Sequence, residues 1–98
     1  MVDNMHPLVA LAYTTITKTL EAGEEKGHGR DSWRGEPKEN HSWKAIRHIT
    51  TAQGVDVLPE YFPDKETAIQ HAEQGLVRAA MYLQILIDEQ HSRNNTDK

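Results

Sequence analysis

The stretch DKETAIQHAEQGLVRAAMYLQILIDEQ, residues 64–90, is the longest periodic segment of the chain, and it decides the fold. Apolar residues recur in it at steps of three and four: Ile69, Ala72, Leu76, Ala79, Leu83 and Leu86. This spacing places their side chains along one stripe of an α-helix. We therefore expect a helix over 64–91 that buries this stripe.

The second half of this expected helix is apolar around most of its circumference. The additional apolar residues are Val77, Ala80, Met81, Tyr82, Ile85 and Ile87. A helix of this kind has to be covered on several sides. Because a chain of 98 residues has little other material to cover it, we expect identical copies to assemble into a helical homo-oligomer with this helix near its centre.

A first helix is expected over 4–22, followed by a loop over 23–40. The apolar stripe of this helix consists of Leu8, Leu11 or Ala12, Ile16 and Leu20. Gly23 provides a C-terminal stop, since glycine readily adopts the backbone conformation that ends helices. The loop holds four of the six glycines and has no hydrophobic period.

A second, short helix is expected over 41–53, capped by Asn40 or Ser42 and stopped at Gly54, with a loop over 54–63. Its core-facing residues are Trp43, Ile46 and Ile49 or Thr50. The sequence therefore predicts one all-α domain over 1–98 that consists of two long antiparallel helices plus a shorter one.

Composition excludes several classes of protein. Apolar residues make up 37% of the chain and charged residues 27%, which is typical of a soluble globular domain. No apolar run approaches the roughly 18 residues that a membrane span needs, and the N-terminus lacks the features of a signal peptide, so we expect a cytoplasmic protein. The net charge of -4 argues against binding to duplex DNA, which depends on many phosphate contacts.

Six histidines raise the question of a metal site. His41 and His48 are seven residues apart on one expected helix, too far along its axis to share one small ion. No HExxH, HD or HxH pattern occurs, and the absence of cysteine excludes thiolate catalysis and cysteine-based zinc sites. We expect neither a metal site nor a cofactor.

Two groups of acids allow an enzymatic interpretation. Glu21, Glu24 and Glu25 have a helical spacing that could hold magnesium on a phosphate chain, and Asp88 with Glu89 could supply a second pair. A solvated acidic face explains the same residues. Because no nucleophile motif occurs either, we expect no catalytic residues.

Three features could instead bind an anionic ligand. The sequence KGHG, residues 26–29, places a lysine and a histidine among glycines, where backbone amides can approach a phosphate. Arg78 lies within the apolar stretch GLVRAAMYL, so it requires either an acid on a neighbouring helix or an anionic ligand. Trp33 either serves a functional loop or plugs the end of the bundle.

The chain resembles the small phage anti-CBASS sponge proteins, which sequester cyclic oligonucleotide messengers of bacterial immunity. The points of similarity lie in an N-terminal helix with a tyrosine, a following lysine, a proline-containing loop and the long helix HAEQGLVRAAMYL with its arginine: Tyr13, Lys26, Trp33, Arg34, Pro37 and Arg78.

This resemblance implies a helical homohexamer without catalytic activity in the cytoplasm of a bacterial host. Tyr13 would stack on a base of a cyclic dinucleotide, and Lys26, supplemented by His28, would bind its phosphate. Pro37 and Arg78 would serve a separate pocket for cyclic trinucleotides.

A second resemblance leads to an enzyme. The order SWR, an aromatic residue with RH, and D-x-E-T with a following histidine is also similar to phage dATP/dGTP diphosphohydrolase-type proteins. This alternative implies metal-dependent hydrolysis of deoxynucleotides, in which His48, Asp64 and His71 would matter most. The sequence departs from that pattern because it has no clear His-Asp pair and no second acidic motif.

Overall fold

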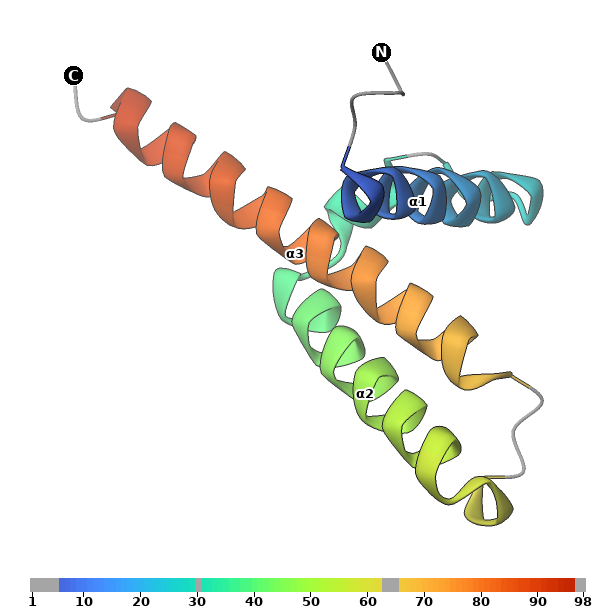
Figure 1. Ribbon diagram of the computed structural model, residues 1–98. Coiled ribbons are helices and arrows are strands. Elements are labelled where there is room, and N and C mark those ends of the chain that lie inside the picture. The colour runs from blue at the N-terminus through green and yellow to red at the C-terminus, as the bar shows by residue number, and fades with distance from the viewer. Residues whose placement is uncertain (1–5, 30, 63–65, 97–98) are drawn as a thin grey trace.

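The computed structural model describes residues 6–29, 31–62 and 66–96 of the chain. Within these ranges the fold is all-helical, as the sequence predicts, and consists of three α-helices and two short 3-10 helices (Figure 1). In chain order these are α1 (Pro7–Glu25), η2 (Ser32–Gly35), α2 (Lys38–Val57), η3 (Pro59–Tyr61) and α3 (Ala68–Thr96).

Helices α2 and α3 form an antiparallel pair, in which α2 lies beside the N-terminal half of α3 (Figure 1). The two backbones approach closely at Gly75, where a Cβ atom would lie only 2.7 Å from Ile49 Cδ1 and 3.4 Å from the Ala45 carbonyl oxygen. Glycine at this position therefore sets the spacing of the pair.

Helix α1 lies across the other side of α3 (Figure 1). Its Thr15 is buried, as is Val77 of α3, which is 2% exposed. Lys18 Nζ of α1 donates a hydrogen bond of 2.9 Å to Glu73 Oε2 of α3. The C-terminal half of α3 extends beyond both neighbours, and Arg34 and Lys38 reach it through ion pairs of 2.8 Å to Asp88 and 2.7 Å to Glu89.

The helix ends differ from the predicted ones because two glycines do not act as stops. Gly23 lies inside α1, which continues to Glu25 and ends in a Schellman motif. In that motif the Gly27 and His28 amides donate 3.0 Å hydrogen bonds to the Glu24 and Gly23 carbonyls, with Gly27 at φ 95°.

Gly54 lies inside α2, which is 20 residues long and begins at Lys38, well before the predicted start. A Cβ atom at Gly54 would collide with the Phe62 ring, so this glycine makes room for the chain that returns after η3. The expected short second helix was therefore wrong, because glycine here serves packing and not termination.

Helix α3 begins later and ends later than predicted. Thr67 and Gln70 form a capping box, in which the Gln70 amide donates to Thr67 Oγ1 at 3.1 Å and the Thr67 amide donates to Gln70 Oε1 at 2.7 Å. Residues 92–96, beyond the predicted end, continue the helix. Asp64 lies outside the described residues.

The predicted core faces of α2 and α3 are not buried within one chain. Ile69 is 72% exposed and Leu83 56%, and Ala72, Leu76 and Ala79 are also exposed. Trp43, Ile46 and Ile49 of α2 are exposed as well. On α3 the residues turned toward α2 are His71 and Gly75, which are buried. No helix in the described ranges is both long and apolar enough to cross a membrane.

Candidate functional site

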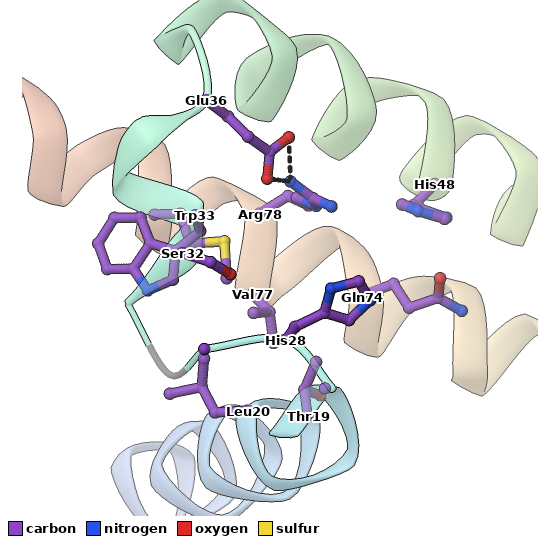
Figure 2. Close-up of a pocket in the computed structure, with 13 residues that line it drawn as sticks. Thr19, Leu20, His28, Ser32, Trp33, Glu36, His48, Gln74, Val77 and Arg78 are labelled. Carbon is purple, nitrogen blue, oxygen red and sulfur yellow. Dashed lines mark hydrogen bonds and ion pairs between the residues drawn. The ribbon is translucent and has the colours of Figure 1, made fainter. Parts of the chain in front are cut away.

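A pocket of about 270 Å³ lies where α1, η2, α2 and α3 meet (Figure 2). Thr19 and Leu20 of α1 close one side of it, Trp33 lies on another, and His48 with Gln74 lies opposite Trp33. We call this cavity the Arg78 pocket, because Arg78 provides the guanidinium group among its lining residues.

Arg78 is held by partners from the segment that enters α2. Its Nη1 atom donates to the two carboxylate oxygens of Glu36 at 3.3 and 3.4 Å. The same Nη1 atom lies 2.8 Å from His41 Nδ1. Arg78 thus has the acidic partner that one sequence interpretation required, although this acid precedes α2 instead of lying on it.

The second partner, His41, is fully buried and fixes the neighbouring loop. Because arginine only donates hydrogen bonds, His41 Nδ1 must accept, which places the ring proton on Nε2. Nε2 then donates to the Trp33 carbonyl oxygen at 2.8 Å. The neutral ring therefore connects α3 to η2 and holds Trp33 at the pocket.

The Trp33 indole has cationic and aromatic neighbours. The Arg34 guanidinium carbon lies 4.5 Å from the indole centroid, within the range of a cation–π contact. The His41 ring meets the indole edge-on, with centroids 6.0 Å apart. These contacts fix the orientation of a half-buried aromatic side chain that lines the pocket.

Glu36 carries a negative charge under ordinary conditions. Burial by itself raises the pKa of this carboxyl, but the charges of Arg78 and Lys44 outweigh the effect of burial and hold the pKa below its usual value. The Lys44 ammonium lies 3.7 Å from Glu36 Oε1. An anionic ligand that approaches Arg78 therefore has to compete with this carboxylate.

Two histidines meet at the edge of the pocket. His48 Nδ1 lies 3.4 Å from His71 Nδ1, and the two ring centroids are 5.6 Å apart. Glu66 Oε2 lies 3.8 Å from His71 Nδ1 and is also bound by Gln74. Burial and the charges of His71, Arg78 and Arg47 lower the pKa of His48, against the opposite effect of Glu66.

The structure brings together only part of the predicted ligand site. His28 and Arg78 both line the pocket, and Pro37 precedes α2 directly after the lining residue Glu36. Lys26 is exposed at the end of α1 and does not line the pocket. Tyr13 is 68% exposed, also outside the pocket.

The KGHG sequence contributes to the pocket through helix termination. Gly27 provides the left-handed residue after α1, and the Schellman motif then uses the amides of Gly27 and His28 internally. These amides are therefore not available as the expected phosphate cradle. Instead, the motif directs the chain so that His28 and Gly29 line the cavity.

The acids of the enzymatic interpretation do not converge. Glu21, Glu24 and Glu25 are exposed on the last turns of α1. Asp88 and Glu89 are paired with Arg34 and Lys38. Among the residues that the structure describes, no group of three or more histidine, aspartate or glutamate side chains is arranged to hold a metal ion.

Sequence reasoning missed His41 and Glu36 as members of the site. No periodicity or motif distinguishes either residue, and both are identified only through their contacts with Arg78. The apolar surroundings of Arg78 in the sequence were the one available signal, since they predicted that partners must exist.

No known family model, curated protein or solved structure matches this chain.

Proposed function

We propose that this protein is a non-enzymatic binding protein that sequesters cyclic di- and trinucleotides. In this proposal it acts as a homo-oligomer in the cytoplasm of a bacterial host and removes the messengers of CBASS immune signalling. The observation that supports it is the Arg78 pocket, which combines a fixed indole, a histidine and a guanidinium group in one cavity.

The chemistry of this combination suits a nucleotide. A guanidinium group binds phosphate through charge-assisted hydrogen bonds, and an aromatic face stacks on a base with about 1–3 kcal/mol per base. Glu36 forms an ion pair with Arg78 in the described structure, and a ligand phosphate would replace the Glu36 carboxylate as the partner of Arg78. The salt bridge would thus keep the guanidinium in place for the ligand.

The size of the pocket supports a site shared between copies of the chain. Its volume of about 270 Å³ is slightly below the roughly 300–1,000 Å³ typical of pockets for drug-sized ligands. One pocket would hold one nucleotide unit, and the remainder of a cyclic ligand would contact other residues. Tyr13, exposed on α1 outside this pocket, is a candidate to stack on a base of a cyclic dinucleotide at a second, separate site.

The direct test mixes the protein with cyclic di-AMP, cyclic GMP-AMP or cyclic tri-AMP and follows binding by calorimetry. The complex is then denatured and the released nucleotide is analysed by mass spectrometry. We expect intact ligand with and without added magnesium or manganese. No heat of binding with any of the three would refute the proposal.

Two substitutions separate the proposed contacts. Tyr13→Ala should weaken dinucleotide binding about 5- to 150-fold, the equivalent of one lost base stack. Its control is Tyr61→Ala, since Tyr61 is equally exposed but lies in η3.

Arg78→Ala should abolish trinucleotide binding selectively, whereas Arg47→Ala should leave trinucleotide binding unchanged. Equal losses of dinucleotide and trinucleotide binding in Arg78→Ala would contradict two separate pockets.

A second candidate function is metal-dependent hydrolysis of deoxynucleotides. The observation that favours it is the meeting of His48 and His71, two residues that the corresponding resemblance singles out, with ring nitrogens 3.4 Å apart. The third such residue, Asp64, lies outside the described residues. The same experiment with dATP and dGTP and manganese distinguishes this candidate, because an enzyme would release hydrolysed products.

A further inference from the structure

One sector of α3 remains uncovered by the other helices of the chain. Helix α2 covers the side of α3 that carries His71 and Gly75, and α1 covers the side that carries Val77. The remaining sector carries six apolar residues, which we call the α3 seam: Ile69, Ala72, Leu76, Ala79, Leu83 and Leu86. All of them are exposed except Leu86, which is half-buried.

The α3 seam has the spacing of a coiled coil. Its residues alternate steps of three and four without interruption over 69–86, the repeat that keeps an apolar line facing a partner helix. These 18 residues correspond to about 27 Å of helix. A shallow apolar groove adjoins the seam, lined by Ile46 and Ile49 of α2 together with Gly75, Leu76 and Ala79.

The exposed surface of the chain is large for its mass. The chain exposes 7661 Å², whereas a compact monomer of 11.2 kDa is expected to expose about 5,700 Å². Its radius of gyration is 15.9 Å, against about 12.6 Å for a compact domain of this length. Even half of the difference between the observed and the expected exposed area exceeds the roughly 800 Å² that each partner buries in a stable interface.

From this geometry we infer that the α3 seam pairs in antiparallel orientation with the α3 seam of a second copy of this chain. The order of residue sizes determines the orientation. The seam uses two positions of a seven-residue repeat. The large residues Leu76 and Leu83 lie at the first of these positions, and the small residues Ala72 and Ala79 lie at the second. In an antiparallel pair each layer combines the two positions, so large residues meet small ones in the four central layers, and Ile69 meets Leu86 in the layer at each end.

In this arrangement Leu76 faces the second copy's Ala79, and Leu83 faces its Ala72. A parallel pair would instead place leucine against leucine and alanine against alanine, which alternates crowded and empty layers. The groove between α2 and α3 extends the same face and brings Ile46 and Ile49 to its edge. The interface is thus isologous, with the same surface contributed by both copies.

The test uses the purified protein without nucleotide, so its result is independent of the proposed ligand. Sedimentation analysis at micromolar concentration should show a dimer, or a larger assembly with an even number of subunits. Leu76→Glu should lose this association while circular dichroism still reports a helical protein. Leu58→Glu is the matched control, because Leu58 is an exposed leucine outside the seam and its substitution should not change the assembly.

The orientation can be tested through cross-linking, since the chain has no native cysteine. Ala79→Cys lies near the centre of an antiparallel pair and should cross-link to a dimer with a short bis-maleimide. Gln90→Cys, farther along the same line, should remain uncross-linked, as should Ala22→Cys on the exposed side of α1. A monomeric wild type, an unaffected Leu76→Glu assembly or efficient cross-linking of Gln90→Cys would each overturn the inference.

Discussion

Two faces of α3 contrast in what they bury. The face that packs against α2 carries His71, Gly75 and Arg78, and its polar groups contact partners within the same chain. The α3 seam carries the most regular apolar stripe of the sequence and lies open to solvent in a single chain. Burial in the single chain therefore follows the available partners and not hydrophobicity alone.

The difference has a physical cause. A buried polar side chain is tolerated when its hydrogen bonds are satisfied, and His41 satisfies both ring nitrogens with Arg78 and the Trp33 carbonyl. An apolar side chain has no such preference for a particular partner and can be covered equally well by another molecule. The face of α3 that carries His71, Gly75 and Arg78, which we call the polar face, thus fixes the fold of one chain. The seam is free to act between chains.

The largest effect is expected where the polar face is broken. His41→Ala removes a fully buried ring and leaves both Arg78 Nη1 and the Trp33 carbonyl oxygen without this partner. We expect the free energy of unfolding to fall by about 2–4 kcal/mol, measured by urea denaturation. His91→Ala, at an exposed position of α3, provides the control and should change stability by less than about 0.5 kcal/mol.

An unfolding energy of His41→Ala within about 0.5 kcal/mol of the wild type would remove the basis of this contrast. The buried histidine would then contribute no more than a surface residue. Tryptophan fluorescence in a Trp43→Phe background, where Trp33 alone emits, provides a second measurement, because the loss of its carbonyl partner should change the environment of the indole.

A pair of truncations compares the two faces of α3 directly. Val77→Ala opens a cavity beneath α1 and should lower the free energy of unfolding by about 1–2 kcal/mol at any protein concentration. Leu83→Ala removes more apolar atoms, but from an exposed site, and should cost less than about 0.5 kcal/mol in dilute protein. Its cost should grow with protein concentration, because association then covers the seam.

The opposite order, with Leu83→Ala more destabilising than Val77→Ala in dilute protein, would mean that the seam is covered within the chain. A concentration-independent cost of Leu83→Ala would separate this effect from association. Circular dichroism of both variants controls for loss of helix.

The helices were predictable from the sequence because their periodicity is local. Amphipathic spacing identified all three helices, but glycine was ambiguous at their ends. Gly23 and Gly54 lie inside helices, whereas Gly27 ends α1 in the left-handed conformation. Whether Gly54 stops α2 depends on its contact with Phe62, which follows in the next turn-containing segment and which helical periodicity does not reveal.

The candidate site was predictable only in part. An arginine among apolar residues implies a partner, and this identified Arg78. Glu36 and His41 lie 42 and 37 residues away in sequence, so only the packing of α2 on α3 reveals them. The seam illustrates the same limit, since periodicity predicted a buried stripe, whereas in the single chain this stripe is exposed.

The smallest effect concerns the pair of His48 and His71, which lies between α2 and the polar face of α3. Burial, His71, Arg78 and Arg47 lower the pKa of His48 in the folded chain, whereas the unfolded chain has a value near 6.5. As the pH falls through 6.5, the unfolded state binds more protons than the folded state, so the free energy of unfolding decreases. The decrease stops below the folded pKa, where both states are protonated.

Urea denaturation at about pH 7.5 and about pH 5.5 measures this effect, and His48→Asn should lose less stability between the two values than the wild type. His28→Asn is the control, because His28 is exposed and should leave the wild-type dependence unchanged. An equal pH dependence in His48→Asn and the wild type would show that protonation at this position costs nothing. The polar face would then accept the positive charge of a protonated His48 beside Arg78. In that case the contrast between the polar face and the seam would depend on His41 alone.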